Sequence, residues 1–170
     1  MSTNAISIQE HIQATEKNLE RLLDWVSRLD SKFPIILGID TAMLGVLATF
    51  APPLCLWSQL MTYFTILSVI FLGSTLLFVY LGSYPQTKGP KKSLLYFGSI
   101  AKSSFSEYRQ IFLNQNPENY LNDLLEQCHR NSEIIDLKFK RLKWAYRTLS
   151  IGVLPWAITV YLFNSIPPSK

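Results

Sequence analysis

The stretch LWSQLMTYFTILSVIFLGSTLLFVYL, residues 56–81, decides the fold. It contains no charged residue and exceeds the roughly 20 apolar residues that a helix needs to cross a hydrocarbon core. Between Phe33 and Lys88 the sequence has a single charged residue, Asp40. A soluble domain of 170 residues leaves much of its surface in contact with water. The nearly uncharged stretch between Phe33 and Lys88 is too apolar to form such a surface. We therefore expect an all-α membrane protein and exclude a soluble globular enzyme.

Two shorter apolar segments, residues 35–51 and 149–166, are predicted to be the first and third membrane spans. The first carries Asp40 and should form a hairpin with residues 56–81, so that residues 34–82 make one transmembrane unit. The third is interrupted by Pro155, which removes a helical hydrogen bond and should bend the segment. The sequence thus predicts three transmembrane helices.

The distribution of Lys and Arg predicts the orientation of these spans. The connection between the first two spans has no Lys or Arg, and Lys170 alone follows the third span. All other basic residues precede the first span or lie between the second and the third. Because positively charged loops stay in the cytoplasm, we expect a cytoplasmic N-terminus and an outer tail at residues 167–170. Cys55 then lies near the outer face and Cys128 inside.

Heptad spacing predicts long helices in the cytoplasmic part. Residues 1–33 form an amphipathic heptad helix, and a second seam starts after Asn116 and Pro117, which resemble an N-cap and a first helical residue. Residues 83–148 should comprise a linker, a helix over 94–113 and a long helix that continues into the third span. We expect a cytoplasmic bundle of three helices. The first seam is Ala5, Ile8, Ile12, Thr15, Leu19, Leu22, Val26, Leu29 and Phe33, and the second is Leu121, Leu125, Cys128, Ser132, Ile135, Phe139, Leu142, Tyr146, Leu149, Val153, Trp156, Val160 and Phe163.

Asp40 is the most conspicuous candidate for function, because an aspartate inside a span costs about 3 kcal/mol on insertion scales. It is predicted either to pair with Lys143 or Arg147 at the base of the third span, or to act in gating with Pro155. Gly38, Ala42 and Gly45 lie on the opposite face of the same helix and would allow close packing against another helix. That helix could belong to the same chain or to a second copy, so a homo-oligomer is one expectation.

Basic residues at 138–147 flank the second seam where it reaches the membrane. We expect them mainly to attract anionic lipid head groups. Phosphate binding by Lys138 and Arg141 is the alternative, since a nucleotide needs cations. The net charge of +4 does not call for nucleic acid as a partner. His11 and His129 are isolated, so we expect no metal site, no cofactor and no enzymatic activity.

Two stretches carry a resemblance to the transmembrane effectors of the Pycsar antiphage system. The first is Asp40-Thr41-Ala42, where the family commonly has Asp-Lys-Ala, so Thr41 departs from the usual residue. The second begins at Tyr120-Leu121-Asn122-Asp123-Leu124 with Gln127 and continues through Ile134-Ile135-Asp136-Leu137-Lys138-Phe139, Leu142 and Ala145. The resemblance covers most of the chain from about Leu19 onward.

The resemblance implies a bacterial inner membrane protein paired with a pyrimidine cyclase that makes cyclic CMP (cCMP) or cyclic UMP (cUMP) on phage infection. The nucleotide would bind the effector, which then impairs the membrane and causes abortive infection. Gln127, Lys138 and Arg141 are the ligand-binding candidates. Two other functions remain open: a constitutive membrane scaffold that recruits a partner through its coiled-coil stalk, and a small channel subunit.

Overall fold

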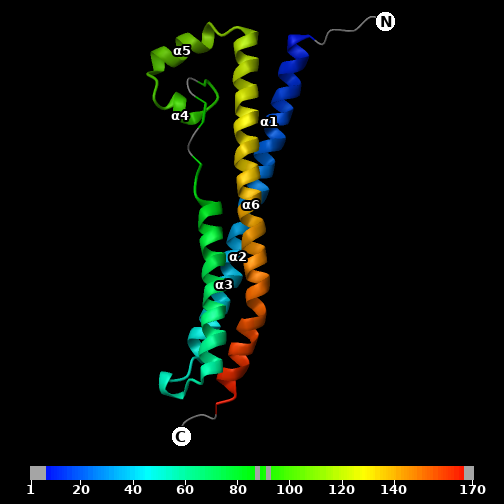
Figure 1. Cartoon of the computed structure of the whole chain (residues 1–170). Helices are drawn as coiled ribbons and strands as arrows, with labels where there is room; N and C mark the ends of the chain where they lie inside the picture. The colour runs from blue at the N-terminus through cyan, green and yellow to red at the C-terminus, as the bar shows by residue number, and fades with distance from the viewer. Residues whose placement is uncertain (1–6, 87–88, 91–92, 167–170) are drawn as a thin grey trace, which may run out of the picture. The chain divides into compact units, whose positions relative to one another are not determined.

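The computed structural model describes residues 7–86, 89–90 and 93–166, and most of these residues are helical (Figure 1). The chain divides into two compact units. We call Met1–Arg28 with Pro85–Leu137 the polar unit, and Leu29–Tyr84 with Lys138–Lys170 the apolar unit. The helices are α1 (Ile8–Asp30), α2 (Lys32–Phe50), the 3₁₀ turn η1 (Leu54–Leu56), α3 (Gln59–Ser83), α4 (Phe97–Ile100), α5 (Phe105–Leu113) and α6 (Pro117–Asn164).

Local sequence explains where several helices begin. Ser7 and Glu10 cap each other reciprocally at the start of α1, with Ser7 N–H donating to Glu10 Oε2 at 2.8 Å. Ser58 accepts a hydrogen bond from Met61 N–H at the start of α3. The predicted cap before α6 is confirmed: Asn116 Oδ1 accepts from Asn119 N–H at 2.7 Å, and Pro117 is the first helical residue.

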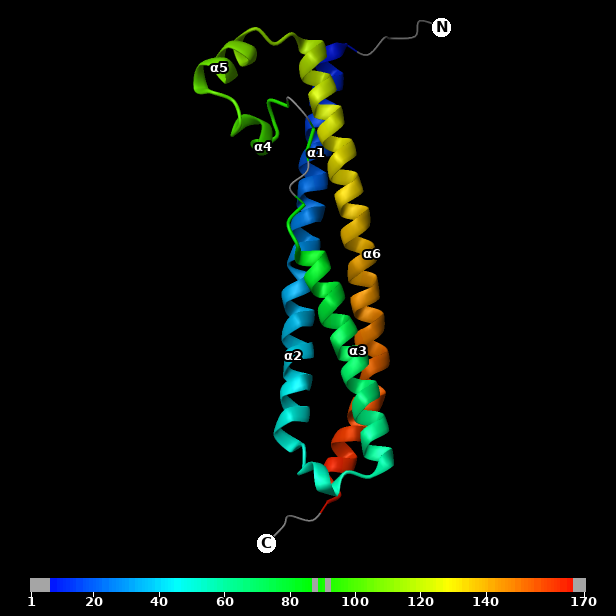
Figure 2. The same ribbon diagram turned by 60° about the vertical axis from the view of Figure 1, so that its left-hand side comes forward.

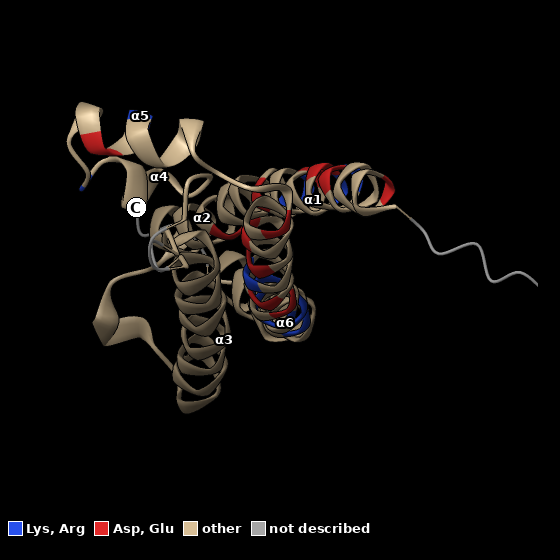
Figure 3. Ribbon diagram, turned by 90° about the horizontal axis from the view of Figure 1, so that it is seen from above, with Lys and Arg blue, Asp and Glu red and all other residues tan. Residues whose placement is uncertain are grey.

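The apolar unit consists of α2, α3 and the second part of α6, which lie side by side (Figures 1 and 2). Large apolar side chains of all three helices face outward, among them Ile35, Ile70 and Leu154. Figure 3 shows α3 without any charged residue. Several polar side chains, by contrast, are fully buried inside the unit: Asp40, Ser68, Thr75 and Thr159. Large exposed apolar surfaces mark contact with a membrane or a partner, and this unit is apolar on its outside and encloses a few polar side chains in a mostly apolar core.

By length and apolar composition, two helical stretches could cross a membrane. One lies within Ile8–Phe50, which comprises α1 and α2, and the other is α3. These correspond to the first two predicted spans. The last part of α6 is not among them, because Arg147 precedes a short apolar run that contains Pro155 and ends at Asn164. The third span therefore stays a prediction.

Residues 94–113 do not form one helix, as the sequence had suggested. The chain turns after the short helix α4, and Ser104 then caps α5 by accepting a hydrogen bond from Glu107 N–H. Serine competes for backbone hydrogen bonds, which favours a helix start over a helix interior. The outer tail predicted at 167–170 and Ala5 of the first seam lie outside the described residues.

The first predicted seam is confirmed at Ile12, Leu29 and Phe33, which are buried. The second seam is wrong in part. Phe139 is 56% and Tyr146 46% exposed, and Leu125 and Val153 are exposed as well. Small or kinked positions take their place on the buried face of α6: Ala145, Gly152, Pro155 and Thr159. Membrane helices approach each other through small residues, and this preference overrides the apolar heptad.

Candidate functional site

Two pairs of hydroxyl groups connect α3 and α6 inside the apolar unit, and all of them except the half-buried Thr148 are buried. Thr75 Oγ1 and Thr148 Oγ1 are 2.8 Å apart, and Ser68 Oγ and Thr159 Oγ1 are 3.3 Å apart. Gly152 lies between them in sequence, and a Cβ atom there would be 3.0 Å from Phe71 Cβ. The absence of a side chain at Gly152 lets the two backbones approach, so that the hydroxyl groups of the two helices come within hydrogen-bond distance of each other.

Asp40 lies on the buried face of α2, with Ile36, Met43 and Leu47. Its side chain is fully buried, and neither carboxylate oxygen has a hydrogen-bond partner among the described residues. Three residues further along the helix, about 5 Å by helical rise, the Met43 carbonyl accepts a hydrogen bond from Trp156 Nε1 at 2.9 Å. Asp40 is therefore enclosed near the α2–α6 contact without compensation for its charge.

The predicted pairing of Asp40 with Lys143 or Arg147 is not formed. Both cations are exposed, because they lie away from the buried face of α6 that carries Leu142 and Ala145. The Arg147 guanidinium instead lies 5.1 Å from the ring centroid of Trp144. The buried Asp40 carboxylate therefore has neither a cation nor a hydrogen-bond donor beside it among the described residues.

Pro155 is buried within α6, which continues through it to Asn164. The Pro155 carbonyl accepts a hydrogen bond from Thr159 Oγ1 at 2.9 Å. Hydroxyl groups of this kind re-satisfy backbone groups around a proline in a membrane helix. Thr159 therefore supports the backbone around Pro155 and also takes part in the pair with Ser68.

Lys138 and Arg141 make defined contacts at one end of the apolar unit. Lys138 is only 6% exposed, and its ammonium group forms an ion pair with Asp30. The Arg141 guanidinium donates a hydrogen bond to the Leu81 carbonyl near the end of α3. A cation near a helix C-terminus interacts favourably with the unpaired carbonyl groups there. Both residues thus hold α6 against the ends of α1 and α3.

The small-residue face of α2 is unpartnered in this single chain. Gly38, Ala42 and Gly45 are all exposed, and a Cβ atom at either glycine would meet nothing within 4 Å. The face that carries Asp40, and not the small-residue face, packs inside the unit.

In the polar unit, residues of the motif that begins at Tyr120 form hydrogen bonds with other segments of the chain. Tyr120 donates a hydrogen bond to Glu16 Oε1 at 2.8 Å, and burial together with this carboxylate raises the pKa of the phenol, which keeps its proton. Asp123 Oδ2 accepts from Leu94 N–H at 2.8 Å, while its other oxygen is buried without a partner among the described residues. One turn later, Gln127 Nε2 donates to Ser93 Oγ at 2.9 Å. The motif therefore fastens α6 to α1 and to the segment before α4.

Ser93 is the centre of this junction. Its Oγ also accepts hydrogen bonds from Leu95 N–H at 3.1 Å and Tyr96 N–H at 2.9 Å. Sequence reasoning did not single out Ser93 or Tyr96. The available signal was a serine shortly before an aromatic, Gly-containing turn, a pattern that typically forms side-chain-to-backbone hydrogen bonds.

A cleft of about 270 Å³ lies beside Gln127 in the polar unit. Its walls come from α1, from described residues before and at the start of α4, and from α6. The lining residues are Leu19, Leu23, Gln86, Gly89, Leu95, Tyr96, Phe97, Gln127, Arg130, Asn131 and Ile134. The three ligand-binding candidates are not brought together, because Gln127 lines this cleft whereas Lys138 and Arg141 belong to the apolar unit.

The protein thus has an apolar helical unit that encloses a few polar side chains, and a polar unit whose helices are joined by the Tyr120 motif. Residues 14–163 match the family model described as the Pycsar effector protein domain. The chain belongs to the Pycsar effector family. Neither the comparison with curated proteins nor that with solved structures finds a match.

Membership in the Pycsar effector family confirms the resemblance based on the Asp40 and Tyr120 motifs. It makes this Pycsar effector a component of antiphage defence that is paired with a cyclase and associated with the membrane. The family is one of effectors and is not a known catalytic family. No cluster of His, Cys, Asp and Glu that could hold a metal occurs within residues 7–86, 89–90 and 93–166.

Proposed function

We propose that this Pycsar effector resides in the bacterial inner membrane and is activated by cCMP or cUMP to impair the membrane, which causes abortive infection. The observation that carries the proposal is the apolar unit, whose outer surface is apolar and whose interior holds Asp40 and the hydroxyl groups of Ser68, Thr75 and Thr159. Polar groups inside a membrane bundle are costly and usually mark a path for ions or water. Together with the family, this arrangement favours a membrane-disrupting effector.

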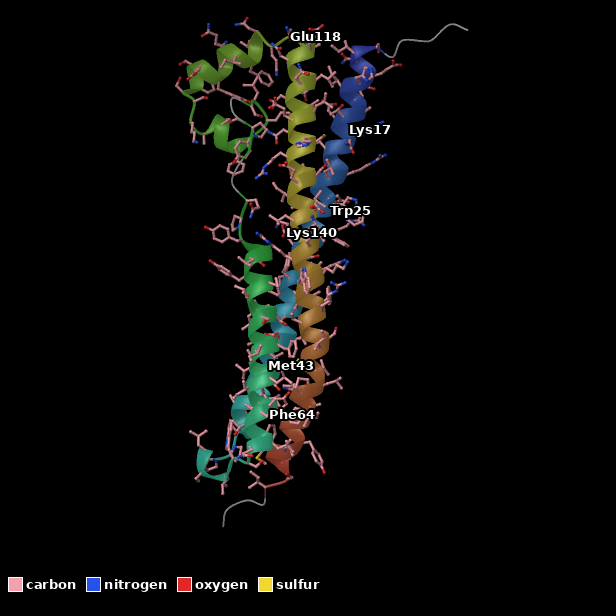
Figure 4. The ribbon with its side chains drawn as sticks, viewed as in Figure 1. Lys17, Trp25, Met43, Phe64, Glu118 and Lys140 are labelled. Atoms are coloured by element: carbon pink, nitrogen blue, oxygen red, sulfur yellow. The ribbon has the colours of Figure 1, made fainter. Side chains whose placement is uncertain are left out.

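In the proposed topology, α2, α3 and the last part of α6 are the three spans. The N-terminus and the polar unit are cytoplasmic, and the C-terminus is periplasmic, in accord with the distribution of basic residues. Lys138 and Arg141 then lie near the inner interface, where cations also attract anionic lipids. Trp25 and Lys17 point outward from α1 in Figure 4, and both are exposed, as expected for a helix face in water.

The proposed mechanism uses the continuity of α6, which contributes residues to both units. A nucleotide can activate the protein only if it binds the active state more tightly than the resting state. A change in how α6 packs in the polar unit would reach Thr148 and Thr159 along the same helix. Separation of the hydroxyl pairs would then expose Asp40 to water. Gly38, Ala42 and Gly45 would pack against a second copy, so that several chains surround the opening.

The alternative is a constitutive scaffold or a small channel subunit. A scaffold would use the α1 seam to recruit a partner and would need no nucleotide. The full burial of Asp40 without a partner disfavours a pure scaffold, because an anchor gains nothing from an uncompensated buried carboxylate.

The test is expression of the effector in bacteria with an active or an inactive pyrimidine cyclase, while membrane potential and entry of a membrane-impermeant dye are followed. We expect depolarisation and growth arrest only with the active cyclase. Depolarisation that is independent of cyclase activity would favour a constitutive channel. An intact membrane in both strains, despite full expression of the effector, would refute the proposal and favour the scaffold.

A further inference from the structure

We infer that the cleft of the polar unit beside Gln127 is the nucleotide site of this effector. The inference rests on the proposed function, because it assigns the ligand proposed there to a particular place. The cleft combines an aromatic wall, three amide side chains and one cation within a single unit. A cyclic pyrimidine nucleotide has a flat base, hydrogen-bonding groups along the base edge and one negative phosphate. Each feature of the ligand has a counterpart among the lining residues.

The aromatic wall is formed by Tyr96 and Phe97, whose ring centroids are 4.8 Å apart. The Tyr96 ring is held between two glycines. A Cβ atom at Gly89 or at Gly98 would come within 2.6 Å of this ring. The Tyr96 ring is thus fixed by close contact with the backbone at both glycines, while the Phe97 side chain is 66% exposed. Nucleic-acid bases stack on aromatic side chains of this kind, which contributes about 1–3 kcal/mol per base in other proteins.

The amides of Gln127 and Asn131 lie one helical turn apart on α6, and both line the cleft. Asn131 Nδ2 donates to the Gln127 carbonyl at 2.9 Å, which holds the Asn131 side chain against the helix. A side-chain amide carries both a donor and an acceptor, and the edge of a pyrimidine base also presents both. Gln127 is only 7% exposed, so a base edge at this depth would be shielded from water.

Arg130 supplies the cation of the cleft. Its guanidinium donates to Glu133 Oε2 at 2.8 Å, an exposed pair that is weakened by solvent. A guanidinium has five N–H donors in a planar fork that matches the geometry of a phosphate. The Arg130 side chain is 27% exposed, which makes it accessible to a ligand that enters from solvent.

Two other clefts of the polar unit lack this combination. One, of about 740 Å³, is lined by Glu107, Asp123 and Glu126 and by no cation, so it would repel a phosphate. The other is lined by Glu16 and polar amides, again without a cation. The volume of about 270 Å³ beside Gln127 lies near the lower end of small-molecule pockets, about 300–1,000 Å³, and suits a mononucleotide better than a larger signal.

This placement also connects the ligand to the helix that leaves the unit. The Gln127–Ser93 hydrogen bond joins α6 to the segment that carries Tyr96. A base that stacks on the exposed Phe97 ring, next to Tyr96, and contacts Gln127 would strengthen or strain this junction directly. The nucleotide would therefore act on α6 itself.

The experiment measures binding of cCMP, cUMP, cAMP and cGMP to the full-length effector in lipid nanodiscs by isothermal titration calorimetry. Arg130→Gln removes the cation of the cleft. Arg109→Gln, on the exposed surface of α5 in the same unit, is the matched control. We expect Arg130→Gln to weaken binding of the pyrimidine nucleotide about ten- to hundredfold, the usual loss for a hydrogen bond to a charged group, and Arg109→Gln to change it less than about twofold.

A second variant, Phe97→Ala, protects the test against misfolding, because this side chain is mostly exposed. We expect it to weaken binding about tenfold through lost stacking. If the wild type binds cCMP or cUMP and both variants bind as tightly as it does, the site assignment is refuted while the proposed function stands. If the wild type binds none of the nucleotides, the proposed activation by a pyrimidine nucleotide fails, and the site assignment fails with it.

Discussion

Replacement of Asp40 by Asn tests whether the buried carboxylate is kept for function at the expense of stability. Asn has nearly the same shape as Asp but carries no charge. An aspartate at the centre of a span costs about 3 kcal/mol on insertion scales, and Asp40 has no hydrogen-bond partner that would offset this among the described residues. The amide that replaces it is also buried without a partner, which costs about 1 kcal/mol. The net expectation is a gain of about 2 kcal/mol, or roughly thirtyfold in the folding equilibrium.

The gain is measured by titrating the purified protein in mild detergent with SDS and following helical circular dichroism. Thr41→Val is the control, because Thr41 is the next residue of α2 and is exposed. In cells with an active cyclase, we expect Asp40→Asn to reduce dye entry and to restore growth, since a group retained despite its cost belongs to the mechanism.

Two outcomes would refute this reasoning about Asp40. An Asp40→Asn protein that unfolds more easily than the wild type would show that the carboxylate is compensated in the membrane. A variant that is more stable but equally toxic would show that the carboxylate has no part in membrane damage.

Three further predictions concern packing and topology. Thr75→Val and Thr148→Val should each destabilise the apolar unit, with a coupling of about 0.6 kcal/mol in a double-mutant cycle, because their hydroxyls are 2.8 Å apart. Gly82→Ala should cost about 1–3 kcal/mol in SDS unfolding, since its Cβ would come within 2.3 Å of a buried Phe33 ring. An impermeant maleimide should label exposed Cys55 in intact cells but not Cys128, because Cys55 is expected outside and burial raises the pKa of the Cys128 thiol.

Each of these predictions has its own contradicting result. Additive effects of the two Val substitutions would show that the hydroxyl pair does not form. Gly73→Ala is the control for Gly82→Ala, because nothing lies within 4 Å of its Cβ position, and equal losses at both glycines would contradict the packing argument. Labelling of Cys55 only after the cells are opened would invert the proposed topology.

The sequence by itself determined the class of this protein. The uncharged run at 56–81 cannot face water in so small a chain, and most of it lies in the helix α3, as predicted. The seam of α1 was readable because this helix is amphipathic, so its apolar residues mark one side. The Asn116 cap and Pro117 were readable because caps depend on local chemistry alone.

Only the tertiary structure decided which faces of α2, α3 and α6 meet. α2 and α3 are apolar almost all round, so hydrophobicity gives no preferred side, and helix contact is settled by close approach and by satisfaction of polar groups. For this reason Gly152 and Thr159 replaced Val153 on the buried face of α6, and the small-residue face of α2 stayed exposed. The Gln127–Ser93 junction joins residues 34 positions apart, a distance across which spacing in the sequence carries no information.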